Sequence, residues 1–106
     1  MNNNRLQQLL EYLKKEPTDP FNLYAVATEY KNSNPNEAIK YFEKLLDMHP
    51  SYLPTYYHLA EVYLSQKMIN KVESIYLKGI ALAKEQKESM ALRELQNAYN
   101  EFLFDS

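Results

Sequence analysis

The chain has 106 residues, an apolar share of 45%, five prolines and one glycine, a composition that is typical of one ordinary helical domain. Its 12 basic and 14 acidic residues interleave and leave a formal net charge of -2, so no broad basic surface exists to hold nucleic acid. There is no cysteine, which excludes disulfides and thiolate catalysis, and no apolar run approaches the roughly 20 residues that cross a bilayer. We expect a cytoplasmic protein without nucleic-acid or membrane partners.

The first predicted helix follows a polar start and ends near Lys15. Its leucines, at positions 6, 9, 10 and 13, recur at helical spacing. Pro17 and Pro20 prevent the helix from continuing. The N-terminal stretch 1–15 mixes polar residues among these leucines and so lacks the apolar core of a secretory signal.

The second and third helices are predicted to flank an Asn- and Pro-rich turn. Asp19 before Pro20 is a helix-start signal, and the second helix is expected to run to about Lys31. The segment 32–36 has the composition of a turn, and the third helix is expected over Glu37 to Met48.

Three further helices are predicted in the second half of the chain. Ser51 is expected to cap the fourth helix, which reaches about Ser65, and Asn70 to cap the fifth, which ends near Lys84. Gly79 lies inside the fifth helix, where it costs about 1 kcal/mol of helix propensity relative to alanine and therefore implies close packing. The last helix is expected from about Ser89, with one apolar face.

Seven positions of the second and third helices recur in the fourth and fifth helices. The first set is Leu23, Val26, Ala27, Tyr30, Ala38, Phe42 and Leu45, and the second is Tyr56, Leu59, Ala60, Tyr63, Val72, Tyr76 and Gly79. The first four pairs are 33 residues apart (23 to 56), and the last three are 34 apart (38 to 72). This period and residue order resemble the tetratricopeptide repeat. Pro17 and Pro50 fall where that family's repeats end, whereas Lys84 and Val72 depart from its usual proline and alanine.

The resemblance implies an all-α fold of about six helices, in which antiparallel hairpins stack as a short right-handed superhelix, an α-solenoid. The predicted organisation is a single domain, 1–106, with an N-terminal half-repeat helix (1–16), two repeats (19–50 and 51–84) and a C-terminal capping helix (88–104). Three pairs of helices meet the expectation that about three repeat-sized units bury a continuous core.

The family also implies that the first helix of each pair lines a concave groove that binds a peptide or helix of another protein. The positions that match the groove are Tyr24, Thr28, Lys31, Tyr57, His58, Glu61, Leu64, Arg93 and Asn97, with Asn100 beside them. Tyr24 and Tyr57 are the candidate apolar anchors, although they could equally pack against neighbouring helices. Glu61 stands where a family subgroup places basic residues to hold a terminal carboxylate, so a clamp of that kind is disfavoured.

Catalysis and metal binding are not expected. The sequence has no nucleophile elbow, no Gly-rich phosphate loop and no HExxH pattern. His58 and Glu61 share a helix face, but no third ligand joins them, so no metal or cofactor is predicted. The favoured function is a non-enzymatic adaptor whose partner the sequence does not identify. The alternative is a self-associating or structural module, a homodimer for example, in which Leu103 and Phe104 supply exposed apolar surface.

Overall fold

The computed structural model describes residues 3–105, and that part of the chain contains six α-helices and no strand. The prediction of an all-α fold with six helices is confirmed. The contacts divide the chain into two compact units, residues 1–55 and 56–106, which are described in turn.

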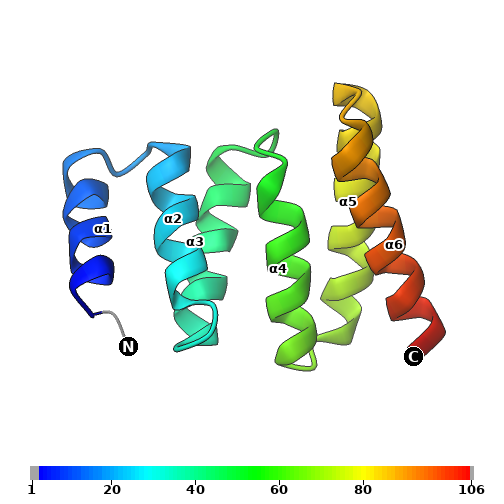
Figure 1. Cartoon of the computed structure of the whole chain (residues 1–106), viewed down its shortest axis with the longest axis horizontal. Helices are drawn as coiled ribbons and strands as arrows, with labels where there is room; N and C mark the ends of the chain where they lie inside the picture. The colour runs from blue at the N-terminus through cyan, green and yellow to red at the C-terminus, as the bar shows by residue number, and fades with distance from the viewer. Residues whose placement is uncertain (1–2, 106) are drawn as a thin grey trace. The chain divides into compact units, whose positions relative to one another are not determined.

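The first unit is built from α1 (Asn3–Lys15), α2 (Pro20–Tyr30) and α3 (Pro35–Met48). Consecutive helices run antiparallel, and α2 lies beside both α1 and α3 (Figure 1). The fully buried side chains of α2 and α3 are Leu23, Val26, Ala27, Ala38, Phe42 and Leu45. These are six of the seven matching positions at which the sequence places one packing face on each helix, and the seventh, Tyr30, is half-buried, so the repeat pattern produces this core.

Polar contacts tie α1 to the start and the face of α2. Asp19 caps α2 by accepting hydrogen bonds from the backbone N–H groups of Phe21 (2.8 Å) and Asn22 (3.4 Å). The Asn22 side chain in turn donates to the carbonyls of Tyr12 and Glu16 at the end of α1 (3.3 and 3.4 Å). One residue thus adds a second hydrogen bond to each of two carbonyls at the end of α1, which also accept from the backbone N–H groups of Glu16 and Asp19.

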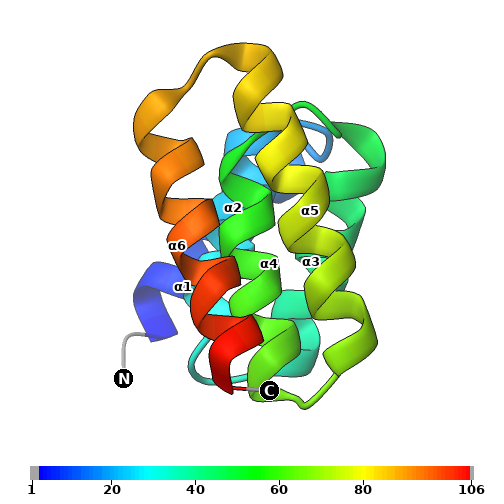
Figure 2. The same ribbon diagram turned by 90° about the vertical axis from the view of Figure 1, so that its right-hand side faces the viewer.

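The second unit comprises α5 (Ile69–Gln86), α6 (Ser89–Asp105) and all of α4 (Pro54–Ser65) beyond its first two residues. Figure 2 shows α5 and α6 as an antiparallel pair, and α4 lies against it. Gly79 of α5 lies at a close contact between helices, since it faces Tyr56 of α4 and Leu95 of α6. The close packing that the sequence predicts at this glycine is therefore present.

Two predicted helix caps are wrong. Ser51 is not the N-cap of α4, because the helix begins at Pro54, three residues later, where proline suits the first helical position. Asn70 lies inside α5, whose N-cap is Met68 and has no side-chain hydrogen bond. In both places, the backbone turn before the helix decides where the helix starts.

Other helix ends differ by two residues from the prediction. α3 begins at Pro35 rather than Glu37, because Asn34 caps it by accepting a hydrogen bond from the N–H of Glu37 (3.3 Å). α5 continues past Lys84 to Gln86 and ends at Lys87, which adopts a left-handed conformation with φ of 59°. The N–H of Lys87 then closes the last turn on the carbonyls of Ala83 and Lys84.

Candidate binding cleft

A cleft of about 340 Å³ opens on the second unit, with residues from α4, α5 and α6 around it. The lining residues are Tyr57, Glu61, Leu64, Ile69, Tyr76, Ala98, Glu101, Phe102 and Asp105. Three of them carry carboxylates and none is basic. The cleft therefore combines an acidic rim with aromatic and aliphatic walls.

Tyr76 and Phe102 are the buried residues of this lining, and Tyr76 has only 3% of its surface exposed. Its ring packs at tilted angles against Tyr99 and Phe102 of α6, with centroid distances of 6.1 and 6.3 Å. Contacts with aromatic rings on α6 hold the Tyr76 ring in position. Among residues 3–105 the hydroxyl of Tyr76 has no hydrogen-bond partner. It is nevertheless not fully enclosed, because among those residues the Thr55 hydroxyl is the only side-chain polar group that is both enclosed and without a partner. The Tyr76 hydroxyl is consequently accessible from the cleft that its side chain lines.

The electrostatic potential of the cleft is negative. Burial, and after it the nearby Tyr57, Glu61 and Glu101, together raise the pKa of Tyr76 to about 12. Burial also raises the pKa of Tyr57, followed in effect by the carboxylates of Glu61, Glu94 and Glu101. Both phenols are therefore neutral near pH 7, and the negative charge belongs to the carboxylates.

His58 lies beside the cleft rather than in its lining. Its ring meets that of Tyr57 edge-on, with centroids 5.7 Å apart, and its Nδ1 lies 3.8 Å from Oε1 of Glu61. The histidine thus supports two lining residues from outside. Within residues 3–105 no three histidine or carboxylate side chains gather closely enough to hold a metal ion.

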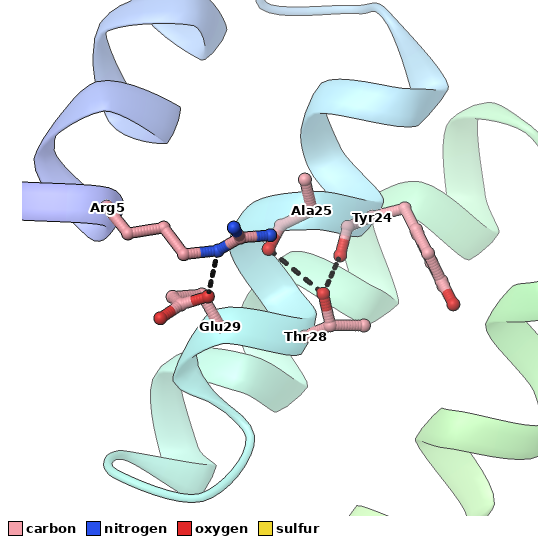
Figure 3. Close-up of polar contacts among 5 residues, drawn as sticks. All are labelled: Arg5, Tyr24, Ala25, Thr28 and Glu29. Carbon is pink, nitrogen blue, oxygen red and sulfur yellow. Dashed lines mark hydrogen bonds and ion pairs between the residues drawn. The ribbon is translucent and has the colours of Figure 1, made fainter. Parts of the chain in front are cut away.

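The predicted groove residues of the first repeat lie in the first unit. Tyr24 packs against Tyr52, with ring centroids 5.7 Å apart and an interplanar angle of 59°. The hydroxyl of Thr28 donates back to the carbonyls of Tyr24 and Ala25, both at 3.0 Å (Figure 3). Lys31 forms the C-cap of α2. The Thr28 donor is thus used within its own helix, and Tyr24 has an aromatic neighbour, as the packing interpretation allowed.

The predicted positions on the last helix do not line the cleft. Arg93 and Asn97 border a separate, open depression of about 440 Å³ near the start of α6, and Asn100 is exposed outside both hollows. The wall that α6 provides to the cleft consists instead of Ala98, Glu101, Phe102 and Asp105. This stripe has helical spacing, with its members three, four and seven residues after Ala98, and could have been found from the sequence. Sequence reasoning also missed Ile69 and placed Tyr76 only in the core.

Comparison with known proteins identifies the class to which this fold belongs. Residues 29–95 match the family described as tetratricopeptide repeat, which is more than half of the chain. The chain therefore belongs to the tetratricopeptide repeat family, as the resemblance predicted. Repeats of this family generally mediate protein–protein interactions and are non-catalytic scaffolds. No curated protein matches the chain.

Solved structures agree with this assignment. The solution structure of a tetratricopeptide repeat domain protein from Salinibacter ruber has 37% identity and a TM-score of 0.76, covering 81% of this chain and 88% of that one. A crystal structure of such a protein from the same organism gives 36% and 0.75, with coverage of 79% and 96%. A Bordetella parapertussis protein shares the fold alone, with 16% identity and a TM-score of 0.82 over 94% and 88% of the two chains.

The length and the apolar character of a helix decide whether it can span a bilayer. No helix within residues 3–105 is both long enough and apolar enough to cross a membrane.

Proposed function

We propose that the protein is a non-enzymatic adaptor that binds a peptide or helix of a partner protein through the groove positions of its repeats. The cleft on the second unit is the observation that carries the proposal, because Tyr57, Glu61 and Leu64 of the predicted groove line it together. The predicted positions outside this lining, Tyr24, Thr28, Lys31, His58, Arg93 and Asn97, remain part of the proposal as further partner-binding positions.

The surface around the cleft has the composition of an interaction site. Leu64 and Ile69 are 41% and 46% exposed, so a bound segment would remove apolar surface from water. Tyr57 presents a half-buried ring that is held in place by His58 and loses little side-chain entropy on binding. By analogy with other interfaces, loss of such an anchor would cost about 2 kcal/mol or more in binding free energy.

The test is affinity capture from a lysate of the source cell with three immobilised proteins: wild type, Tyr57→Ala and Tyr12→Ala. Tyr12 is exposed on α1 and does not line the cleft, so its variant is the matched control. Circular dichroism must first show that all three are folded. A protein captured by the wild type and the control but lost with Tyr57→Ala supports the proposal. If every captured protein is retained by Tyr57→Ala, the cleft is not the binding site.

Self-association is the alternative function, and the end of α6 supplies an observation in its favour. Phe104 is 90% exposed and its neighbour Leu103 is 47% exposed, so neither is covered by the core of the chain. A homodimer formed through them would disappear with Phe104→Ser, which light scattering over a concentration range would detect. The cytoplasmic location and the repeat limits 19–50 and 51–84 stay predictions.

A further inference from the structure

We propose that the cleft on the second unit receives the side chain of a lysine or arginine from a basic segment of the partner protein. The inference rests on the proposed adaptor function and adds the chemistry of the ligand. Three features of the cleft lead to it: the placement of its carboxylates, an unpartnered hydroxyl and the apolar walls between them.

The carboxylates lie where a helix disfavours them. Glu101 and Asp105 are one turn apart on α6, so their like charges repel each other. They also occupy the last turns of that helix, which contain no basic residue and where the helix dipole is negative. Glu61 of α4 adds a third carboxylate to the same lining. A cation bound among them would relieve each of these repulsions, whereas an anionic segment would add to them.

The hydroxyl of Tyr76 provides a neutral hydrogen-bonding group inside this acidic rim. It has no partner among residues 3–105, although its side chain is almost fully buried. Because this hydroxyl is open to the cleft, a ligand can pair with it without first displacing a partner from the protein. Its oxygen can accept a hydrogen bond from an ammonium or guanidinium group, both of which carry several donors.

The walls suit the aliphatic part of a long cationic side chain. Lysine and arginine bury three or four methylene groups while their charged ends remain near polar partners. Tyr57 and Phe102 provide aromatic surface in the cleft, and aromatic faces attract such cations. A short acidic or small polar side chain would satisfy neither the walls nor the rim.

The experiment is a selection of random 12-residue peptides displayed on phage, carried out with intact wild-type protein, and repeated with two matched double variants. Glu101→Gln with Asp105→Asn removes two of the three carboxylates of the lining and is called the neutralised cleft below. Glu85→Gln with Asp47→Asn removes the same charges from exposed positions outside the lining. We expect lysine or arginine at a fixed position in peptides from the wild type and the control, and no such enrichment from the neutralised cleft.

The best peptide then allows a quantitative test by fluorescence anisotropy. Replacing its selected basic residue by glutamine should weaken binding to the wild type about tenfold but hardly change binding to the neutralised cleft. Tyr76→Phe, which retains the ring, should weaken binding of the basic peptide several-fold. The basic peptide should also lose affinity as salt is raised.

Two negative results have different meanings. Selected peptides whose binding is lost with Tyr57→Ala, but which show no basic residue at a fixed position, would overturn this inference and leave the adaptor function standing. If no selected peptide requires Tyr57, the adaptor function itself fails, and the inference fails with it.

Discussion

A Cβ atom placed on Gly79 would lie 2.7 Å from the Cβ atom of Tyr56, closer than two side chains can approach. The same atom would lie 3.3 Å from Cδ2 of Leu95, so α5 is pressed against both α4 and α6 at this residue. Because the nearest atom belongs to the rigid start of a side chain, a change of rotamer cannot relieve the contact. The glycine therefore sets the spacing of all three helices that surround the cleft.

Gly79→Ala is expected to destabilise the protein by about 1 to 2 kcal/mol. Helix propensity alone would favour alanine by about 1 kcal/mol, but the overlap with Tyr56 outweighs this gain. Urea denaturation measures the difference. Ala81→Gly, at an exposed position two residues later, is the control and should cost about 1 kcal/mol through propensity alone. A Gly79→Ala variant that is more stable than the wild type would contradict the close packing.

Tyr76→Phe is expected to leave the unfolding free energy unchanged near pH 7 or to raise it by up to about 1 kcal/mol. The phenylalanine ring keeps the contacts with Tyr99 and Phe102 and removes a hydroxyl that has no partner among residues 3–105. Thermal and urea unfolding check this result. A loss above 2 kcal/mol would mean that the hydroxyl does hold the native structure together.

Alkaline pH is expected to destabilise the wild type more than Tyr76→Phe. The pKa of Tyr76 is about 12 in the folded protein, against the ordinary tyrosine value of 10.0, so the folded state keeps this proton to higher pH. The stabilisation of the folded state that comes from this raised pKa is fully present below pH 10. It is lost as the pH rises towards 12, at about 1.4 kcal/mol of unfolding free energy per pH unit. Denaturation midpoints between pH 9 and about pH 11 measure this, with the exposed Tyr12→Phe as control. Equal pH dependence in all three proteins would refute it.

Asp19→Ala is expected to lower the unfolding free energy by about 1 kcal/mol. The substitution removes the N-cap of α2, whose side chain accepts from Phe21 and Asn22. Asp47→Ala, in the last turn of α3, also removes an aspartate but should not destabilise, because a carboxylate is unfavourable at a helix C-terminus. Chemical denaturation of both variants decides the matter, and equal losses would argue against capping as the cause.

Glu29→Gln is expected to reduce stability by less than 1 kcal/mol. Glu29 on α2 forms an ion pair with Arg5 on α1, with Nε and Oε1 2.9 Å apart (Figure 3). The arginine is mostly exposed, so water and salt screen the attraction. Denaturation at low salt should reveal the difference, which should vanish in about 1 M NaCl. A difference that persists in high salt would mean that shape rather than charge joins the two helices.

The helices and their packing faces were predictable because they rest on spacing. Leu23, Phe42 and Leu59 fall on the buried faces that a helical period requires, and all three are fully buried. The caps were less predictable. Ser51 and Asn70 have suitable side chains, but the turn before Pro54 and the turn that ends at Met68 fix the start of α4 and α5. A side chain that is suitable for capping does not by itself show at which residue the turn ends and the helix begins.

The cleft was only partly predictable. Tyr57, Glu61 and Leu64 follow from the repeat register on α4, because equivalent positions face the same way in each repeat. The last helix has no counterpart in the repeat, so the register does not fix its rotation. The sequence therefore predicts Arg93 and Asn97 as groove residues, whereas Ala98 and Glu101 line the cleft in the structure. Tyr76 appeared to be core from its spacing, and only the three-dimensional arrangement reveals that a buried residue also faces a cleft.

The position of Asp105 in the cleft lining has a practical consequence for handling the protein. A purification tag or fluorescent fusion attached directly after Ser106 would begin two residues after the lining residue Asp105. A histidine-rich or lysine-rich tag placed there would be an intramolecular competitor for the cleft, with a high effective concentration. Binding studies should therefore carry the tag at the N-terminus, and a tag-dependent loss of binding would itself report occupation of the cleft.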